Sequence, residues 1–342
     1  MEKNSRTIDP PEAPAIPGLS FRAFRGPADF PGMVAVHDAC RPVDGYEHPV
    51  STADLARHFS HLERCEPRRD MIVAEVGGEI VGYGRGEWHE EPDGTRLHDL
   101  TGHVAPAWRR RGIGHAILRW TEERQREVAA ATPAAVPRFF QVDTQDSERG
   151  MPELLTGAGY RIVRRWYKMT RPLDEEPPEA PLPPGLEVRP VTPDLYRRVW
   201  EADTEAFRGS WGFREPSEDD YREWLEEPLA MQAALWQVAW EGEEVAGQVR
   251  SYIDAAENAG LGLRRGYTES ISVRPRWRRH GLAYALIMRS LRVLRERGMT
   301  EAALYVDTEN LSGALRLYER CGYRPLRSGS NYRKPLAAAA QE

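Results

Sequence analysis

Two arginine-rich segments of the chain each lead into a predicted helix through small residues. They read "VAPAWRRRGIGHAIL" from Val104 and "VRPRWRRHGLAYALI" from Val273. The first N–H groups of a helix have no acceptor within the helix, and the helix dipole favours a negative charge beside them. Small residues also let a pyrophosphate approach the main chain, and arginine adds positive charge.

The second segment therefore predicts a phosphate site formed by Arg278, Arg279, His280, Gly281, Leu282 and Ala283. The first segment predicts the same kind of site at Arg109, Arg110, Arg111, Gly112, Ile113 and Gly114. Neither segment has the glycine spacing of the Rossmann pattern or the Gly-Lys-Ser/Thr of the Walker pattern. Taken singly, either segment is also compatible with a helix start that has a basic, solvent-exposed face.

The elements that would position these turns also repeat along the chain. "LSFRAFRGPADF" from Leu19 and "LEVRPVTPDLY" from Leu186 each predict a short strand, a proline break and an amphipathic helix. Both copies continue with a strand hairpin, the arginine-rich turn and a further strand and helix. The chain is therefore predicted to contain two copies of one α/β unit.

Composition sets the expected boundaries of these copies. Residues 1–18 are rich in proline and charge and are expected to be a disordered tail, as are residues 337–342. The proline-rich residues 172–185 predict a semi-rigid linker. The N-terminal domain is thus expected at residues 19–171 and the C-terminal domain at residues 186–336.

Charge and hydropathy exclude several functional classes. The 342 residues carry a net charge of −6, which argues against a broad nucleic-acid surface. No apolar run approaches the about 18 residues of a membrane span, so we expect a cytoplasmic protein without a membrane partner. The three cysteines are widely spaced, and His58 and His61 have no neighbouring ligands, so no metal site is expected.

The two copies resemble the GCN5-related N-acetyltransferase (GNAT) superfamily, arranged in tandem. The resemblance covers most of residues 19–335 and is most specific in the second copy, where "YVDTENLSGALRLYERCGYRP" follows the arginine-rich turn. This segment is similar to the family's closing pattern at Asn310, Ala314, Tyr318, Gly322 and Tyr323, with one extra residue after Asn310. The resemblance implies two α/β domains, each a twisted mixed β-sheet flanked by helices and split into a V.

The same resemblance implies how acetyl-CoA, the co-substrate, would bind in the V. The pantetheine arm would pair with the strand before the turn, at Ile271 and Val273 in the second copy and at Val104 in the first. A backbone N–H near Val273 would hold the oxyanion. Asn310 suits the N-cap of the following helix and is expected to help bind the cofactor.

Transfer of an acetyl group to an amine needs a base for the amine proton and an acid for the departing thiolate. In "YTESISV", alternation predicts that Tyr267, Glu269, Ile271 and Val273 share one face, so Glu269 is the acidic member of an apolar set. We predict Glu269 as the base, acting through water; the alternatives are Tyr267, two residues earlier, or a merely exposed glutamate. Tyr318 is the acid that the resemblance implies, and a packing tyrosine is its alternative.

The first copy lacks both proton-transfer groups. Counting from Val104 places Leu100 at the position of Glu269, and counting from Gly159 places Leu155 at the position of Tyr318. We therefore expect the C-terminal domain to be catalytic. The N-terminal domain is expected to be a scaffold or a second acetyl-CoA binder.

The sequence thus predicts an N-acetyltransferase that modifies the primary amine of a small molecule and exists as a monomer or homodimer. The acceptor is expected near residues 203–228, where the aromatic residues line a pocket or belong to an ordinary core: Phe207, Trp211, Phe213, Tyr221 and Trp224. Two alternatives are a non-catalytic acetyl-CoA sensor or partner-binding module, and a transferase that uses a longer acyl-CoA.

Overall fold

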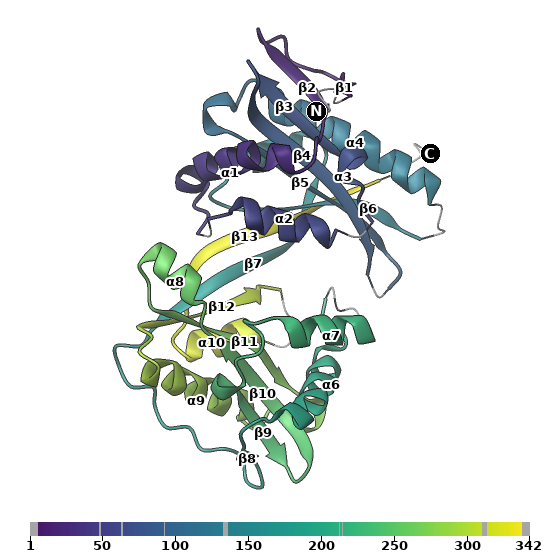
Figure 1. Cartoon of the computed structure of the whole chain (residues 1–342). Helices are drawn as coiled ribbons and strands as arrows, with labels where there is room; N and C mark the ends of the chain where they lie inside the picture. Colours follow the sequence, from purple (N-terminus) through teal and green to yellow (C-terminus); the bar gives the residue numbers. More distant parts are fainter. Residues whose placement is uncertain are drawn as a thin grey trace. The chain divides into compact units, whose positions relative to one another are not determined.

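The computed structural model describes residues 6–47, 49–62, 64–91, 93–132, 136–211, 213, 215–309 and 313–336. Contacts divide the chain into two compact units. Unit 1 contains Met1–Arg164 and Gly329–Glu342, and unit 2 contains Arg165–Ser328. Each unit is an α/β sheet with helices on both faces, as the sequence predicts (Figure 1).

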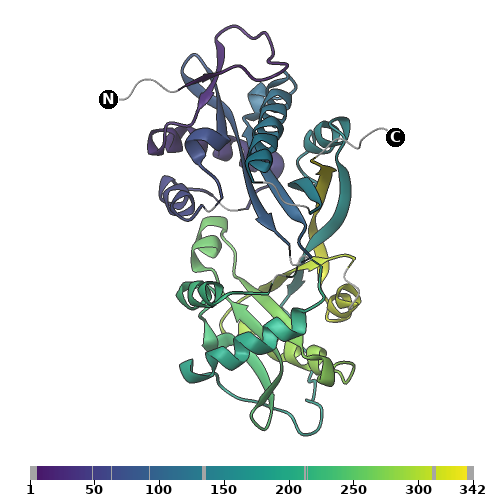
Figure 2. The same ribbon diagram turned by 90° about the vertical axis from the view of Figure 1, so that its right-hand side faces the viewer.

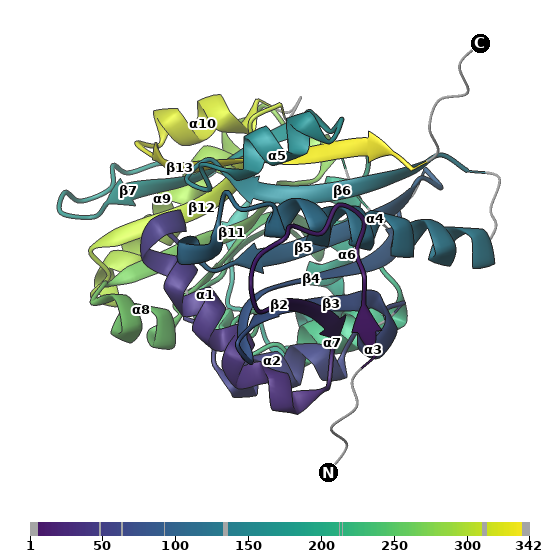
Figure 3. The same cartoon turned by 90° about the horizontal axis from the view of Figure 1, so that it is seen from above.

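Unit 1 has its strands in the order β1-β2-β3-β4-β5-β6-β13. The strands are β1 (Thr7–Ile8), β2 (Leu19–Ala23), β3 (Met71–Val76), β4 (Glu79–Glu90), β5 (Arg96–Val104), β6 (Arg138–Gln145) and β13 (Arg324–Pro335). The helices are α1 (Phe30–Asp44), α2 (Thr52–Ser60), α3 (Pro67–Asp70), α4 (Ile113–Ala131) and α5 (Met151–Gly157). Strands β2 to β6 run side by side in Figure 3.

Separate cores hold α4 and α1 to opposite faces of the sheet of unit 1. Helix α4 buries Ile113 and Ala116 against Ile72 of β3. Helix α1 buries Met33 with Met71 on the other face, where α2 also packs. Figure 2 shows the purple helices α1 and α2 and the teal helix α4 on opposite sides of the strands.

Unit 2 has its strands in the order β7-β12-β11-β10-β9-β8. The strands are β7 (Arg161–Pro172), β8 (Glu187–Val188), β9 (Gln237–Glu241), β10 (Glu244–Tyr252), β11 (Arg265–Val273) and β12 (Glu301–Asp307). The helices are α6 (Tyr196–Phe207), α7 (Glu218–Glu226), α8 (Ala255–Leu261), α9 (Leu282–Glu296) and α10 (Ala314–Arg320).

The helices of unit 2 also cover both faces of their sheet. Ala239 of β9 packs in the core beneath α9, with Leu286 and Leu291. Its neighbours Val238 and Trp240 pack in a second core that includes Val199 of α6. Because successive strand residues point to opposite faces, α9 and α6 lie on opposite faces of this sheet.

The last strand of each sequence copy belongs to the other unit's sheet. Strand β7 ends the first copy, yet it pairs antiparallel with β12 of unit 2 from Trp166 to Pro172. Strand β13 ends the second copy, yet it pairs antiparallel with β6 of unit 1 from Gly329 to Pro335. The units therefore differ from the expected domains at 19–171 and 186–336.

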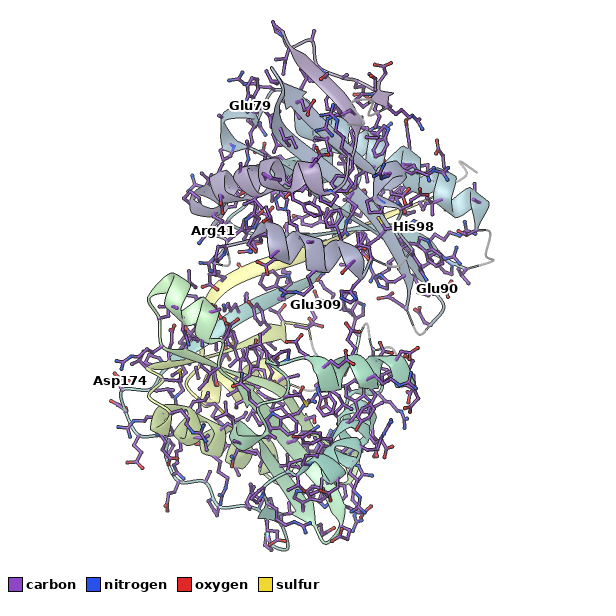
Figure 4. The ribbon with its side chains drawn as sticks, viewed as in Figure 1. Arg41, Glu79, Glu90, His98, Asp174 and Glu309 are labelled. Carbon is purple, nitrogen blue, oxygen red and sulfur yellow. The ribbon has the colours of Figure 1, made fainter. Side chains whose placement is uncertain are left out.

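The two segments expected to lack regular contacts are ordered where the structure describes them. Thr7 and Ile8 form β1, which pairs with β2, and Ile8 is buried. In the expected linker, Leu173 and Ala180 are buried in the core of unit 2. Asp174 beside them is exposed (Figure 4). The expectation of a disordered tail is wrong from residue 7, and residues 173–180 form part of unit 2.

Both sheets split where a V was expected. Strand β11 pairs in parallel with β12 only from Arg265 to Tyr267, and its remaining residues have no partner in β12. In unit 1, β5 pairs with β6 only from Arg96 to Asp99. The second half of each central strand is therefore free to pair with a ligand on that side.

Candidate active site

A bulge interrupts β11 directly after the predicted base. Gln248 of β10 pairs with Ser272, but Arg250 pairs with Glu269, so β11 contains one extra residue between these pairs. Ser270 takes up the extra length with a left-handed φ of 45°. Bulges of this kind redirect the side chains beside them.

The bulge changes which side chains share a face of β11. Ile271 and Val273 pack against the core that α9 covers. Arg250, the cross-strand neighbour of Glu269, instead donates to Asp203 of α6. Cross-strand neighbours lie on one face, so Glu269 belongs to the α6 face. The prediction that Glu269 shares a face with Ile271 and Val273 is therefore wrong.

Glu269 lies in surroundings that disfavour its charge. Burial raises the pKa of this carboxyl to about 7, and the positive charges of Arg250 and Lys168 partly offset the rise. A carboxyl group with a pKa near neutrality suits a general base. Glu269 can therefore take up and release a proton near neutral pH, and its role as base stays a prediction.

Tyr318 lies within electrostatic reach of Glu269. Its side chain is only 8% exposed, and burial raises the pKa of its phenol, with Glu269 adding to the rise. The ring stacks edge-on against Tyr323, at 6.3 Å between centroids. Glu269 therefore influences Tyr318 electrostatically, and burial keeps the Tyr318 phenol protonated through the neutral range.

The arginine-rich turn of unit 2 has the backbone expected of an anion site. Arg279 and Gly281 are left-handed, with φ of 67° and 83°. Gly281 is the N-cap of α9 and has no side-chain cap, so the N–H groups of Leu282 and Ala283 have no acceptor within the helix. Leu282 is buried and Ala283 is half-buried. His280 is exposed beside them.

The first arginine of this turn is occupied by the protein itself. Arg278 donates to the carbonyl oxygens of Val273, at 2.9 Å, and Ala206 of α6, at 2.7 Å. These bonds tie the end of β11 to α6, so the side chain positions the turn. Asn310, also expected to help bind the cofactor, lies outside the described residues.

The turn of unit 1 has the same backbone but a more strongly bound arginine. Arg110 and Gly112 are left-handed, with φ of 61° and 88°, and α4 starts at Ile113, followed by Gly114. Arg109 donates to the Val104 carbonyl at 2.9 Å and forms an ion pair with buried Asp44 at 2.5 Å.

The other two arginines of this turn also have partners within unit 1. Arg110 pairs with Glu153, and Arg111 lies over the ring of Trp108. All three arginines of the turn are therefore engaged.

Unit 1 contains a cavity of about 830 Å³ beside this turn. The cavity lies between the end of β5 and the start of α5, lined among others by Leu100, Val104, Arg109, Gly112, Glu148 and Leu155. The position matches the cleft expected for acetyl-CoA in the first copy.

The N-terminal segment approaches the same turn. A side chain at Gly112 would lie 3.1 Å from Pro14, and Glu12 accepts a hydrogen bond from His115 at 2.9 Å. A carboxylate therefore already lies beside the first turn of α4.

Equivalent contacts identify the residues of unit 1 that replace the proton-transfer groups. Tyr160 N–H donates to the Leu155 carbonyl just as Tyr323 N–H donates to the Tyr318 carbonyl, which confirms the predicted match of Leu155 and Tyr318. Strand β5 has no bulge, and Arg85 pairs with Thr101 as Arg250 pairs with Glu269.

Thr101, rather than the expected Leu100, thus stands at the position of Glu269. The error arose because the count from Val104 assumed strands of equal length. Neither threonine nor leucine can act as a base, so the expected loss of this group is unchanged.

A buried polar chain beside Glu269 was not predicted from the sequence. Lys168 Nζ donates to the Tyr267 hydroxyl at 2.7 Å, and that hydroxyl donates to Glu257 at 2.7 Å. All three side chains are buried. The rarity of lysine, of which Lys168 is one of three, was the available signal, but the partners of Lys168 are distant in sequence.

Two of the five predicted acceptor residues, Tyr221 and Trp224, belong to an aromatic cluster. Trp224 of α7 lies 5.0 Å from Trp200 and 5.9 Å from Trp236, and Tyr221 packs beside it. Trp211 is 41% exposed. The cluster lies on the α6 face, which is also the face of Glu269.

Two expected absences concern metal ligands and membrane spans among the described residues. No group of three or more metal-ligating side chains occurs there. None of the described helices has the length and apolar character needed to cross a bilayer.

Known sequences match both halves of the chain. The profile described as the acetyltransferase (GNAT) family matches residues 196–323, and the profile described as an acetyltransferase (GNAT) domain matches residues 67–142. The chain is a tandem GNAT protein. The predicted enzyme class and co-substrate are confirmed with it: this is an acetyl-CoA-dependent N-acetyltransferase.

Relatives of this tandem GNAT protein match most of its length. A mycothiol acetyltransferase from Geodermatophilus obscurus is 28% identical over 307 residues, covering 87% of this chain and 91% of its own. One from Streptomyces scabiei is 29% identical over 310 residues, covering 88% and 90%.

Solved structures show the same fold. A GCN5-related N-acetyltransferase from Sphaerobacter thermophilus has a TM-score of 0.73 at 26% identity, covering 95% of this chain and 98% of its own. A tandem GNAT protein from the clavulanic acid biosynthesis pathway has a TM-score of 0.66 at 17% identity, covering 94% and 100%. The predicted fold class is confirmed.

Proposed function

We propose that unit 2 transfers the acetyl group of acetyl-CoA to the primary amine of a small polar molecule, with Glu269 as base and Tyr318 as acid. One observation supports the proposal: Glu269, just past the point where β11 leaves β12, acts electrostatically on Tyr318, in the unit whose α9 start has N–H groups with no acceptor within the helix. Unit 1 has no equivalent pair.

The residues of unit 2 fit acetyl-CoA. The N–H groups of Leu282 and Ala283 would bind the pyrophosphate, and the unpaired edge of β11 at Ile271 and Val273 would receive the pantetheine arm. Acetyl-CoA, when bound, supplies an activated acetyl thioester. Arg279 and His280 would add positive or polar groups at the exposed rim of the turn.

Glu269 and Tyr318 divide the proton transfers between them. A carboxyl group with a pKa of about 7 is partly deprotonated at neutral pH and can accept the amine proton, directly or through water. The Tyr318 phenol keeps its proton because burial raises its pKa. It can therefore protonate the departing thiolate sulfur.

The acceptor we propose first is the amine of the mycothiol precursor, in which cysteine is joined to glucosaminyl-inositol. Support comes from relatives named mycothiol acetyltransferase, which match most of both chains. The aromatic cluster around Trp224 lies on the same face as Glu269 and offers rings against which a sugar can pack.

We infer that unit 1 performs no acetyl transfer, because Thr101 and Leu155 replace the two proton-transfer groups. Its cavity and its turn at Val104 and residues 109–114 support a second acetyl-CoA site. Glu12 and Pro14 would have to leave the turn for the pyrophosphate to enter.

The proposal is tested by measuring CoA release from acetyl-CoA with a panel of amines, using wild type, Tyr318→Phe and Tyr323→Phe. The panel contains the mycothiol precursor, glucosamine, an aminoglycoside and a polyamine. We expect turnover with one class of amine, its loss in Tyr318→Phe with acetyl-CoA binding retained, and its retention in Tyr323→Phe. Binding of acetyl-CoA without turnover on any amine would contradict the proposal and favour the sensor alternative.

A further inference from the structure

Each cation beside Glu269 is bound to a different carboxylate. Arg250 Nη2 lies 2.7 Å from Asp203 of α6. Lys168 is bound through Tyr267 and lies 3.8 Å from Glu257 of α8. No ion pair joins either cation to Glu269 in the described part of the chain.

Arg250 is nevertheless the residue best placed to pair with Glu269. The two are cross-strand partners in an antiparallel pair, so their side chains leave the sheet on the same face and close together. A guanidinium paired with a carboxylate forms strong charge-assisted hydrogen bonds that occupy the carboxylate oxygens. Such a pair would hinder Glu269 from accepting a proton.

Asp203 holds Arg250 through a nearly buried network. The side chains of Arg250 and Asp203 are 10% and 13% exposed. Arg250 Nη2 also donates to Ser270 at 2.6 Å, and Ser272 donates to the second oxygen of Asp203 at 2.7 Å. The network therefore binds both sides of the bulge to α6.

The ring of Trp224 completes the restraint on Arg250. The guanidinium carbon lies 4.9 Å from the centre of that ring, within the range of a cation–π contact. Trp224 belongs to α7, in the aromatic cluster of the predicted acceptor region.

Unit 1 provides an internal comparison. Counting from Pro27 and Pro193, which begin matching 3-10 turns, His37 of α1 stands at the position of Asp203. Arg85 stands at the position of Arg250, but its carboxylate partner is Glu87 of its own strand.

The unit without the base also lacks the bulge. Strand β5 keeps one register throughout, and His103 stands at the position of Ser272. The helix aspartate, the bulge and the glutamate therefore occur together in unit 2 and are all absent from unit 1.

We propose that Asp203 is a positioning residue of the acetyl transfer: it holds the Arg250 guanidinium against α6 and so keeps Glu269 free to accept the amine proton. The inference rests on the proposed role of Glu269 as base. Asp203 itself touches neither substrate nor the reacting atoms.

The test is the pH dependence of kcat/KM for Asp203→Asn in the full-length protein. The released guanidinium should pair with Glu269 and lower its pKa, so the acidic limb of the profile should move down by about one to three pH units. The plateau should fall by roughly tenfold or more as the base weakens and becomes occupied. An unchanged limb in a folded variant would overturn the proposal.

A second pair of variants tests the direction of the change in the pKa of Glu269 and controls for misfolding. Arg250→Gln removes a charge that lowers the pKa of Glu269, so its limb should move to higher pH. The double variant should follow Arg250→Gln, because no guanidinium remains to be released. A double variant that behaves like Asp203→Asn would overturn the proposal. Arg85→Gln in unit 1 is the matched control and should leave the profile unchanged.

Other titratable groups also lie around Glu269 and bear on the pH profile. Among the described residues these are Lys168 of β7, Tyr252 of β10 and Tyr318 of α10. Burial raises the pKa values of both tyrosines, so they stay protonated through the neutral range. Lys168 retains its partners in all the variants.

A pH titration of the Glu269 carboxyl group, which needs no turnover, tests this inference separately from the proposed function. The glutamate carboxyl carbons are labelled with ¹³C, the Glu269 signal is assigned with Glu269→Gln, and its shift is followed with pH in wild type and Asp203→Asn. A lowered midpoint in Asp203→Asn supports the inference even where no amine is acetylated. An equal midpoint in both proteins overturns it while leaving the proposed function to its own assay.

Discussion

Glu269 carries its carboxyl group where burial disfavours the charge, and we expect this penalty to affect both the rate and the stability. Glu269 stands directly before the bulge of β11. Its positively charged neighbours Arg250 and Lys168 are held by Asp203 and Glu257. In the proposed mechanism Glu269 must be deprotonated to act as base, so its raised pKa would set the pH above which acetyl transfer begins.

The first prediction concerns the rate. With Glu269 titrating at a pKa of about 7, kcat/KM should fall about tenfold per pH unit below that value and level off above it. Glu269→Gln should lose the limb and about 100- to 10,000-fold of the plateau. The measurement is kcat/KM from pH 5.5 to 9 for both proteins. A limb near the ordinary value for glutamate, or an active Gln variant, would contradict the assignment.

The second prediction concerns stability. The folded pKa of Glu269 lies above the unfolded one, so the folded state loses stability as the pH rises between them. Glu269→Gln removes this penalty and should raise the free energy of unfolding at pH 8 by up to about 3 kcal/mol, with little change at pH 5. Urea unfolding at the two pH values decides it. Equal stabilities at pH 8 would show that the charge is well solvated.

At the scale of elements, the two arginine-rich turns and the strands beside them were predictable, but the bulge in β11 was not. Both turns have a left-handed arginine and glycine at matching places, because a helix start with this sequence is a local structure. The bulge at Ser270 depends on β10 and on the contact of Arg250 with α6. Such pairings join residues distant in sequence, so alternation alone predicted the wrong face for Ile271 and Val273.

The third prediction concerns the segment that lies on the first turn. Glu12 and Pro14 stand where a pyrophosphate would approach α4, and the carboxylate repels a phosphate. Glu12→Gln combined with Pro14→Gly should therefore raise the affinity of unit 1 for acetyl-CoA. Isothermal titration should then show two sites per chain where wild type shows one strong site.

The control for that titration is Glu153→Gln, which removes the carboxylate paired with exposed Arg110 and leaves the N-terminal segment in place. Two equally strong sites in wild type would mean that the segment does not obstruct the turn.

At the scale of the whole molecule, the exchange of β7 and β13 means that neither sequence copy contains a complete sheet. Composition indicated a boundary near residues 172–185, because proline and charge are the usual marks of a linker. The exchange leaves no such mark, since a strand has the same alternating pattern whichever sheet it joins.

The fourth prediction follows from the exchange. A protease site inserted at the exposed residues Asp174–Glu176 should allow complete cleavage without separation of the two halves. Each half supplies a strand to the sheet built by the other, with β7 bound to β12 and β13 bound to β6. The cut and uncut proteins should elute together in size-exclusion chromatography and differ only under denaturing conditions. Halves that separate in native buffer would contradict the pairing.

The exchange also sets the order in which the protein can be completed during its synthesis. Strand β6 ends at Gln145, but its antiparallel partner β13 ends at Pro335. At ordinary rates of translation the ribosome needs about 10 to 40 s to make the chain between them. Unit 1 must wait through that interval with the edge of β6 unpaired, exposed to chaperones and to neighbouring nascent chains. A ribosome that stops before β13 therefore releases a chain that lacks only the last strand of the second copy, yet the sheet left unfinished is the N-terminal one.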